Sequence, residues 1–160
     1  MTSSPGTPDP TRTAYHEAGH AIVAHALGQR VKRMEILENL SGTTEIPWPD
    51  ETGSIDVDLQ IKRIAVMVAG YVAEEMAMRN NDRGTEYRSA VERVGLVLRI
   101  EGHGLRHDEP EAVVAEQEGR ARGILTDNRQ VMDELALELE QRKFLTGDSL
   151  NRFLRRVRVT

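Results

Sequence analysis

The 160-residue sequence contains no cysteine, only one tryptophan and two phenylalanines. Without cysteine the chain forms neither disulfides nor thiolate zinc sites, so any metal must be bound by histidines and carboxylates. With so few aromatic residues, the core must be built mainly from Leu, Val, Ile, Ala and Met. A chain of this length buries enough apolar surface to fold without a metal, so we expect any metal here to serve a function.

Two further absences narrow the class of protein. No apolar run approaches the roughly 20 residues that span a bilayer, and the N-terminal stretch MTSSPGTPDPTRT lacks the basic and then hydrophobic pattern of a signal peptide. The formal net charge of −5 gives no general case for nucleic-acid binding. We therefore expect a soluble, cytoplasmic protein that binds neither membranes nor nucleic acid.

The pattern of apolar residues predicts a mainly α protein with a small antiparallel β-sheet (α+β). Residues 1–12, rich in Pro, Ser, Thr and Gly, are predicted to be a disordered leader, with a single domain at 13–160 and a first helix capped by Thr11 or Thr13. Alternation predicts a strand at 30–37, with 41–46 as its hairpin partner or an edge strand. Helical periodicity covers residues 14–27, 59–78, 85–101, 110–125, 126–142 and 147–157.

The stretch TAYHEAGHAIVAHALG, residues 13–28, contains two histidines four residues apart. On a helix this spacing turns His16 and His20 about 40° from each other, so that both imidazoles can reach one ion. Glu17 lies about 100° around the axis, where it can act on a water without being a ligand. Gly19 is unfavourable inside a helix, so we expect it to serve close packing. The motif predicts a zinc-dependent hydrolase of amide bonds that needs one further ligand.

The segment TAYHEAGHAIVAH closely resembles the zinc-binding helix of the FtsH-type ATP-dependent metalloproteases. Three later segments are similar to that family in the same order. IAVMVAGYVAEEMAMR resembles its second helix, and RGTEYRSAVERVGLVLRIEG resembles the helix that supplies the third metal ligand. GRARGILTDNRQVMDELALELEQRKFLTGDSLNRFL resembles the C-terminal helices of its peptidase domain. The resemblance runs from about Thr11 to Arg158 and implies an FtsH-type peptidase domain with a zincin-like catalytic helix.

The resemblance implies that His16 and His20 are Zn²⁺ ligands and that Glu17 is the catalytic base. The third position departs from the family, which usually has an aspartate at the start of the third helix. Matching this segment without gaps places Glu86 there. Because glutamate is one methylene longer, either the helix stands slightly farther from the metal or the carboxylate takes a different rotamer.

Other ionisable residues are candidates for supporting roles. Asp82, in the turn before the third helix, is the main competitor of Glu86 for the metal. Glu74 and Glu75 are expected to hydrogen-bond a ligand imidazole or to form ion pairs within the fold. His25 lies about 140° around the helix from His20 and so points off the metal face.

The segment EILENLSGTTEI lies, by the same resemblance, beside the metal helix. In zinc proteases a strand in this place receives the substrate as an added strand, because main-chain hydrogen bonds hold an extended peptide without reading its side chains. We therefore predict Ser41, Gly42, Thr43 and Thr44 as substrate-binding residues. The alternative is an ordinary edge strand without this role.

The FtsH-type proteases carry a membrane anchor and an AAA-type ATPase upstream of the peptidase domain, whereas this sequence contains no GxxxxGK[ST] phosphate-binding loop. We therefore expect a zinc endopeptidase that does not bind ATP and that hydrolyses unfolded or flexible polypeptides without it. The resemblance is also compatible with a homo-oligomer. Two alternatives stay open: a peptidase subunit served by a separate ATPase, and a non-proteolytic metal-binding regulatory module.

Overall fold

The computed structural model describes residues 9–49, 53–79 and 82–160, and shows the expected combination of a mainly helical fold with a small antiparallel sheet. None of the helices in these ranges has the length and apolar character needed to cross a bilayer. The elements in chain order are α1 (Pro10–Ala26), β1 (Arg33–Ile36), β2 (Gly42–Glu45), α2 (Val57–Met78), α3 (Gly84–Leu98), α4 (Pro110–Asp127), α5 (Arg129–Arg142), β3 (Phe144–Thr146) and α6 (Gly147–Leu154).

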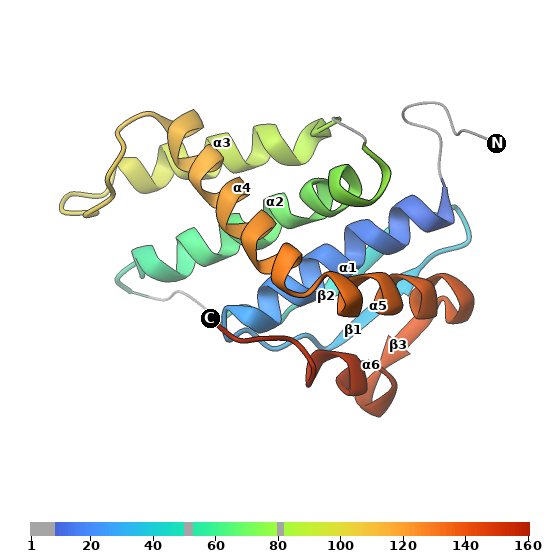
Figure 1. Cartoon of the computed structure of the whole chain (residues 1–160). Coiled ribbons are helices and arrows are strands. Elements are labelled where there is room, and N and C mark those ends of the chain that lie inside the picture. Colours follow the sequence, from blue (N-terminus) through green and yellow to red (C-terminus); the bar gives the residue numbers. More distant parts are fainter. Residues whose placement is uncertain (1–8, 50–52, 80–81) are drawn as a thin grey trace.

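Helix α1 is the central element of the fold (Figure 1), because α2, α4, α5 and the sheet all pack against it. Small residues line its contact with α2. A Cβ atom added at Gly19 would lie 2.5 Å from the main-chain oxygen of Ala69 and 2.7 Å from the Cβ of Ala73. No side chain fits at these distances, so the prediction that Gly19 serves close helix packing is confirmed.

The first helix begins earlier than predicted. Asp9 caps it by accepting a hydrogen bond of 2.9 Å from the amide of Thr11, and Pro10 occupies the first turn, where a missing N–H is harmless. The expectation that residues 10–12 belong to a disordered leader is therefore wrong, while residues 1–8 of that leader lie outside the described residues. The hydroxyls of Thr11 and Thr13, both proposed as caps, instead donate to Glu140 and to the carbonyl of Leu40.

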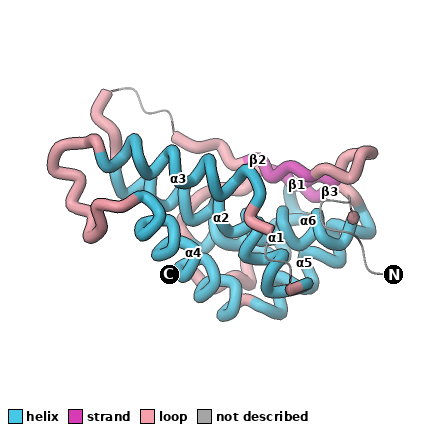
Figure 2. Tube along the Cα trace, turned by 90° about the horizontal axis from the view of Figure 1, so that it is seen from above, coloured by secondary structure: helices cyan, strands magenta, loops and turns pink. Residues whose placement is uncertain are grey.

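The sheet has the strand order β2-β1-β3, with both pairings antiparallel. The three strands lie side by side at one side of the helical part (Figure 2). Met34 stands opposite both Thr44 and Leu145, so these three residues share the face that packs on α1, where Met34 and Leu145 are fully buried. Thr43 and Phe144 lie on the exposed face. The sequence did not predict β3, because three residues between two helices carry no readable alternation.

Helix α3 packs against α2 and α4, and a charged contact to α4 holds its N-terminal end. The hydroxyl of Tyr71 in α2 donates to the Glu118 carboxylate of α4 at 2.7 Å, and the Arg83 guanidinium approaches the same carboxylate at 3.5 Å. That guanidinium also lies over the ring of Tyr87, 4.9 Å from its centroid. These contacts fix the position of the helix that carries Glu86.

The packing at Gly19 predicts that Gly19→Ala destabilises the protein. The substitution gains about 1 kcal/mol in helix propensity but forces overpacking that typically costs about 1–3 kcal/mol, and here meets main-chain atoms that cannot move aside locally. Urea unfolding should therefore show a lower midpoint. The matched control is Gly123→Ala inside α4, where an added Cβ meets nothing within 4 Å and should raise the midpoint. Equal stabilisation by both changes would contradict the packing argument.

Candidate metal centre

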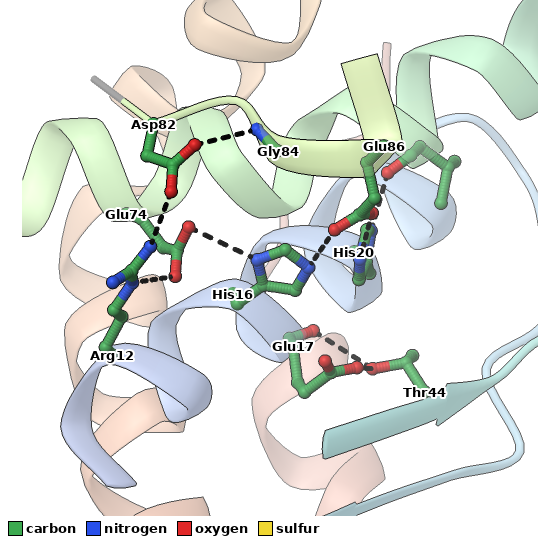
Figure 3. Close-up of polar contacts among 10 residues, drawn as sticks. Arg12, His16, Glu17, His20, Thr44, Glu74, Asp82, Gly84 and Glu86 are labelled. Atoms are coloured by element: carbon green, nitrogen blue, oxygen red, sulfur yellow. Dashed lines mark hydrogen bonds and ion pairs between the residues drawn. The ribbon is translucent and has the colours of Figure 1, made fainter. Parts of the chain in front are cut away.

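Two histidines of α1 and one glutamate of α3 converge at the junction of these helices (Figure 3). The Nε2 atom of His16 lies 2.5 Å from one carboxylate oxygen of Glu86, and the Nε2 atom of His20 lies 3.3 Å from the other. One donor atom from each of the three residues falls within 4.8 Å of the others. The structure thus brings together the three side chains that the sequence analysis predicted as metal ligands.

The remaining ring nitrogens of the two histidines face acceptors on α2. The Nδ1 atom of His20 lies 2.7 Å from the carbonyl oxygen of Val66, and the Nδ1 atom of His16 lies 3.5 Å from the carboxylate of Glu74. Since a carbonyl oxygen only accepts, the Nδ1 atom of His20 carries the proton. The Nε2 atom, which faces Glu86 at 3.3 Å, is then the atom whose lone pair a cation can use when the ring is neutral. Metal-binding histidines are commonly held in this way.

A glycine of α2 makes room for both imidazoles. A Cβ atom at Gly70 would lie 2.5 Å from the Nε2 atom of His16 and 2.7 Å from that of His20. Val66, Gly70 and Glu74 are spaced four residues apart and so lie along one face of α2. This face provides an acceptor for each histidine and a gap between the two acceptors. The sequence analysis did not single out Gly70, although a glycine inside a long helical pattern is a signal of close approach.

The acidic group that holds His16 is itself paired. One oxygen of the buried Glu74 carboxylate accepts a 2.7 Å hydrogen bond from Arg12 of α1, which compensates its charge. Glu75 points elsewhere and pairs with Arg122 at 2.9 Å. The expectation that Glu74 and Glu75 hydrogen-bond an imidazole or form ion pairs is confirmed.

Asp82, the competing candidate for the third ligand, has a different set of contacts. One of its oxygens accepts from the amide of Gly84 at 3.0 Å, at the start of α3, and the other lies 3.9 Å from the Arg12 guanidinium. Its side chain is half exposed. The geometry therefore favours Glu86 over Asp82 beside the two histidines.

Glu17 lies between α1 and the sheet, with 6% of its surface exposed. Figure 3 shows it on the β2 side of the imidazole pair, and its carboxylate accepts a 2.7 Å hydrogen bond from the hydroxyl of Thr44. Of the four residues predicted to bind substrate, Gly42, Thr43 and Thr44 belong to β2. Ser41 precedes this strand and donates to the side chain of Asn39 in the hairpin turn.

The other histidines lie away from this cluster. His25 borders an open cavity of about 710 Å³ at the C-terminal end of α1, and burial lowers its pKa. His103 accepts from the amide of Leu105, and His107 pairs with Glu116 at 3.0 Å. The prediction that His25 points off the metal face agrees with this placement.

Known proteins are similar to this chain over the segments that carry the histidines. The sequence model of the Peptidase M50B-like family matches residues 10–77, which include all of α1 and nearly all of α2. The ATP-dependent zinc metalloprotease FtsH of Chloroflexus aggregans is 29% identical over 91% of this chain, and FtsH 1 of Sorangium cellulosum is 30% identical over 81%. The chain is thus similar in sequence to part of these FtsH zinc metalloproteases. It spans only 28% and 22% of the length of these two relatives.

This homology supports a metallopeptidase family and a metal cofactor for the chain. The family-model match contains His16, Glu17 and His20 but ends before Glu86. The three-dimensional structure therefore adds what the shorter match leaves out, namely that a carboxylate from the next helix meets the histidine pair.

The electrostatics of the cluster set the protonation states of its metal-free form. Burial on its own lowers the pKa of His16, but hydrogen bonds to the Glu74 and Glu86 carboxylates outweigh it and raise that pKa to about 10. For Glu86, burial raises the pKa, but hydrogen bonds to His16 and His20 prevail and lower it to about 2. At neutral pH the metal-free site therefore holds a protonated His16 paired with an ionised Glu86.

These protonation states predict that Zn²⁺ binding at pH 7 releases the proton that His16 carries, because a cation binds only a neutral imidazole. His16 carries the proton below a pKa of about 10, so zinc affinity should rise with pH up to that value. Glu86 is ionised above a pKa of about 2 and contributes no proton at pH 7. Calorimetric titration in buffers of different ionisation enthalpy measures the release. A binding heat that does not depend on the buffer would contradict the assignment.

The positions of the Glu86 and Asp82 carboxylates predict that their removal has different effects on Zn²⁺ binding. Glu86→Ala should weaken Zn²⁺ binding by roughly 10-fold or more, since even outer groups around metal sites contribute this much. The control Asp82→Ala removes a carboxylate of the same region that contacts Gly84 and Arg12 instead. Competition with a chromogenic chelator gives both affinities. A larger loss for Asp82→Ala than for Glu86→Ala would reverse the choice of third ligand.

Proposed function

We propose that the protein is a zinc-dependent endopeptidase that hydrolyses unfolded or flexible polypeptides without ATP. The observation that carries this proposal is the convergence of the His16 and His20 Nε2 atoms on Glu86, with Glu17 one residue along α1. Homology to zinc metalloproteases supports the same class of reaction.

The donor set suits Zn²⁺. Two imidazoles with their Nε2 atoms facing inward and one carboxylate would make a three-ligand site, the number of protein ligands that is usual in catalytic zinc sites. When bound, zinc supplies Lewis-acid activation of a water and of the scissile carbonyl. Val66 and Glu74 orient the rings, and Arg12 balances the charge of Glu74. Other divalent ions that accept nitrogen and oxygen ligands compete for such a site.

Glu17 performs the proton transfers in this proposal. Its carboxylate accepts a proton from the attacking water and then delivers that proton to the nitrogen of the leaving amine. Its position next to the first histidine, on the turn of α1 that faces β2, supports this role.

We propose β2 as the strand that receives the substrate, with Ser41, Gly42, Thr43 and Thr44 along it. The strand order β2-β1-β3 places β2 at an edge of the sheet in the described part of the chain, where one row of its main-chain groups has no strand partner. An extended peptide can pair with this row whatever its side chains are. This mode of binding accounts for a preference for unfolded chains.

A peptidase subunit served by a separate ATPase is the second candidate. It is favoured by the names of the relatives, which are ATP-dependent. On this hypothesis the same site would cut chains that the ATPase unfolds and delivers, and a homo-oligomer would restrict access to it.

Cleavage of unfolded casein by the zinc-loaded protein tests the proposal, with Glu17→Gln as the matched variant. We expect Glu17→Gln to bind Zn²⁺ stoichiometrically and to lose activity by at least about 100-fold, the usual contribution of a general base. Wild-type activity should be unchanged by ATP, should disappear with a chelator and should return with added zinc.

Three outcomes decide between the alternatives. Zinc binding without cleavage by the wild-type protein would favour the non-proteolytic regulatory module. Cleavage that appears only when an ATPase partner is supplied would favour the second candidate. Absence of metal binding would overturn every version of the proposal.

A further inference from the structure

The hydroxyl of Thr44 is directed at Glu17 from the neighbouring strand. It lies 2.7 Å from the Oε1 atom of the carboxylate and 3.2 Å from the main-chain oxygen of the same residue. The carboxylate oxygen is the nearer of the two acceptors and is therefore the main one. Fixing Oε1 also fixes the direction in which the second carboxylate oxygen points.

Gly42 confines the stem of the same side chain. It lies two residues before Thr44, and thus on the same face of β2. A Cβ atom at Gly42 would lie 2.6 Å from the Cγ atom of Glu17 and 2.9 Å from its Cδ atom, and 2.8 Å from the Cγ2 atom of Thr13. Glu17 therefore passes directly over the main chain of β2. Every residue other than glycine at this position would displace it.

We propose that Thr44, assisted by Gly42, is a positioning residue for the general base. This inference rests on the proposed peptidase function and concerns how the strand that binds substrate also orients Glu17. One face of β2 holds the carboxylate through the Thr44 hydroxyl, and the outer edge of the strand offers main-chain groups to the peptide. One short element thus sets the base and the substrate relative to each other.

Accurate placement matters because proton transfer needs hydrogen-bond reach between base and water. Misplacement by about 1 Å can slow a reaction roughly 100-fold. A threonine on a half-buried strand supplies this placement at little cost, since its β-branched side chain suits the strand and its hydroxyl satisfies a buried carboxylate.

Thr44→Val tests the proposal, because valine keeps the shape and strand propensity of threonine and removes only the hydroxyl. With casein as substrate, we expect kcat to fall roughly 10-fold, the loss typical of groups that orient the ligands of metal sites, with KM and zinc content little changed. Thr44→Ser, which keeps the hydroxyl, should recover most of kcat. The control Thr126→Val removes an exposed hydroxyl that donates to the Arg122 carbonyl in α4 and should leave kcat unchanged.

A Thr44→Val variant with the kcat of the wild type would overturn the proposal. A higher KM with unchanged kcat would do so as well, since it would show that Thr44 acts on substrate binding alone. A Thr44→Ser variant as slow as Thr44→Val would show that the hydroxyl is not the group that matters.

A double-mutant cycle separates this inference from the peptidase proposal. Urea unfolding of Thr44→Val, Glu17→Ala and the double variant reports the contact whether or not the protein cleaves anything. We expect the two changes to be non-additive. Additive effects would overturn the contact, whereas a wild-type protein that cleaves nothing in the casein assay would overturn the proposed function.

Discussion

The close approach of α1 and α2 is the constraint on which the site depends. Gly19 lets the two helices come so near that an added methyl would collide with main-chain atoms of α2, and Gly70 opens the space into which both imidazoles project. Because the two glycines lie on opposite partners of the same contact, neither helix can move without changing how the histidines lie against α2. Dense packing, which is usually a matter of stability, here determines where the donor atoms lie.

The charges of the site form one continuous arrangement that spans three helices. Arg12 pairs with Glu74, Glu74 faces His16, and both histidines face Glu86 on α3. The buried carboxylate of Glu74 thus has a partner of opposite sign, which is the condition for keeping an ionised group away from water. A divalent cation in place of the His16 proton would add one positive charge to this arrangement, close to the carboxylates of Glu74 and Glu86.

The local features of this protein were readable from its sequence, and the long-range ones were not. The spacing within HEAGH predicted the histidine pair and the place of Glu17, since both depend only on helix geometry. Glu86 came from resemblance to a family, because nothing local connects it to residues 70 positions earlier. Val66 could not be found in this way, because a main-chain acceptor has no side-chain signature, whereas Gly70 does carry a signal, that of a glycine inside a helical pattern. The start of α1 was misplaced because Asp9 and Pro10 were assigned to a polar leader.

The face of α2 that holds the two histidines offers each of them a different kind of acceptor. His20 is held by the carbonyl of Val66, a main-chain atom that every amino acid at that position would supply, whereas His16 depends on the side chain of Glu74. A single substitution of Glu74 can therefore loosen the imidazole of His16. The hydrogen bond to His20 changes only if the helix itself is deformed. In evolutionary terms, one half of the histidine pair is tunable and the other is built into the backbone.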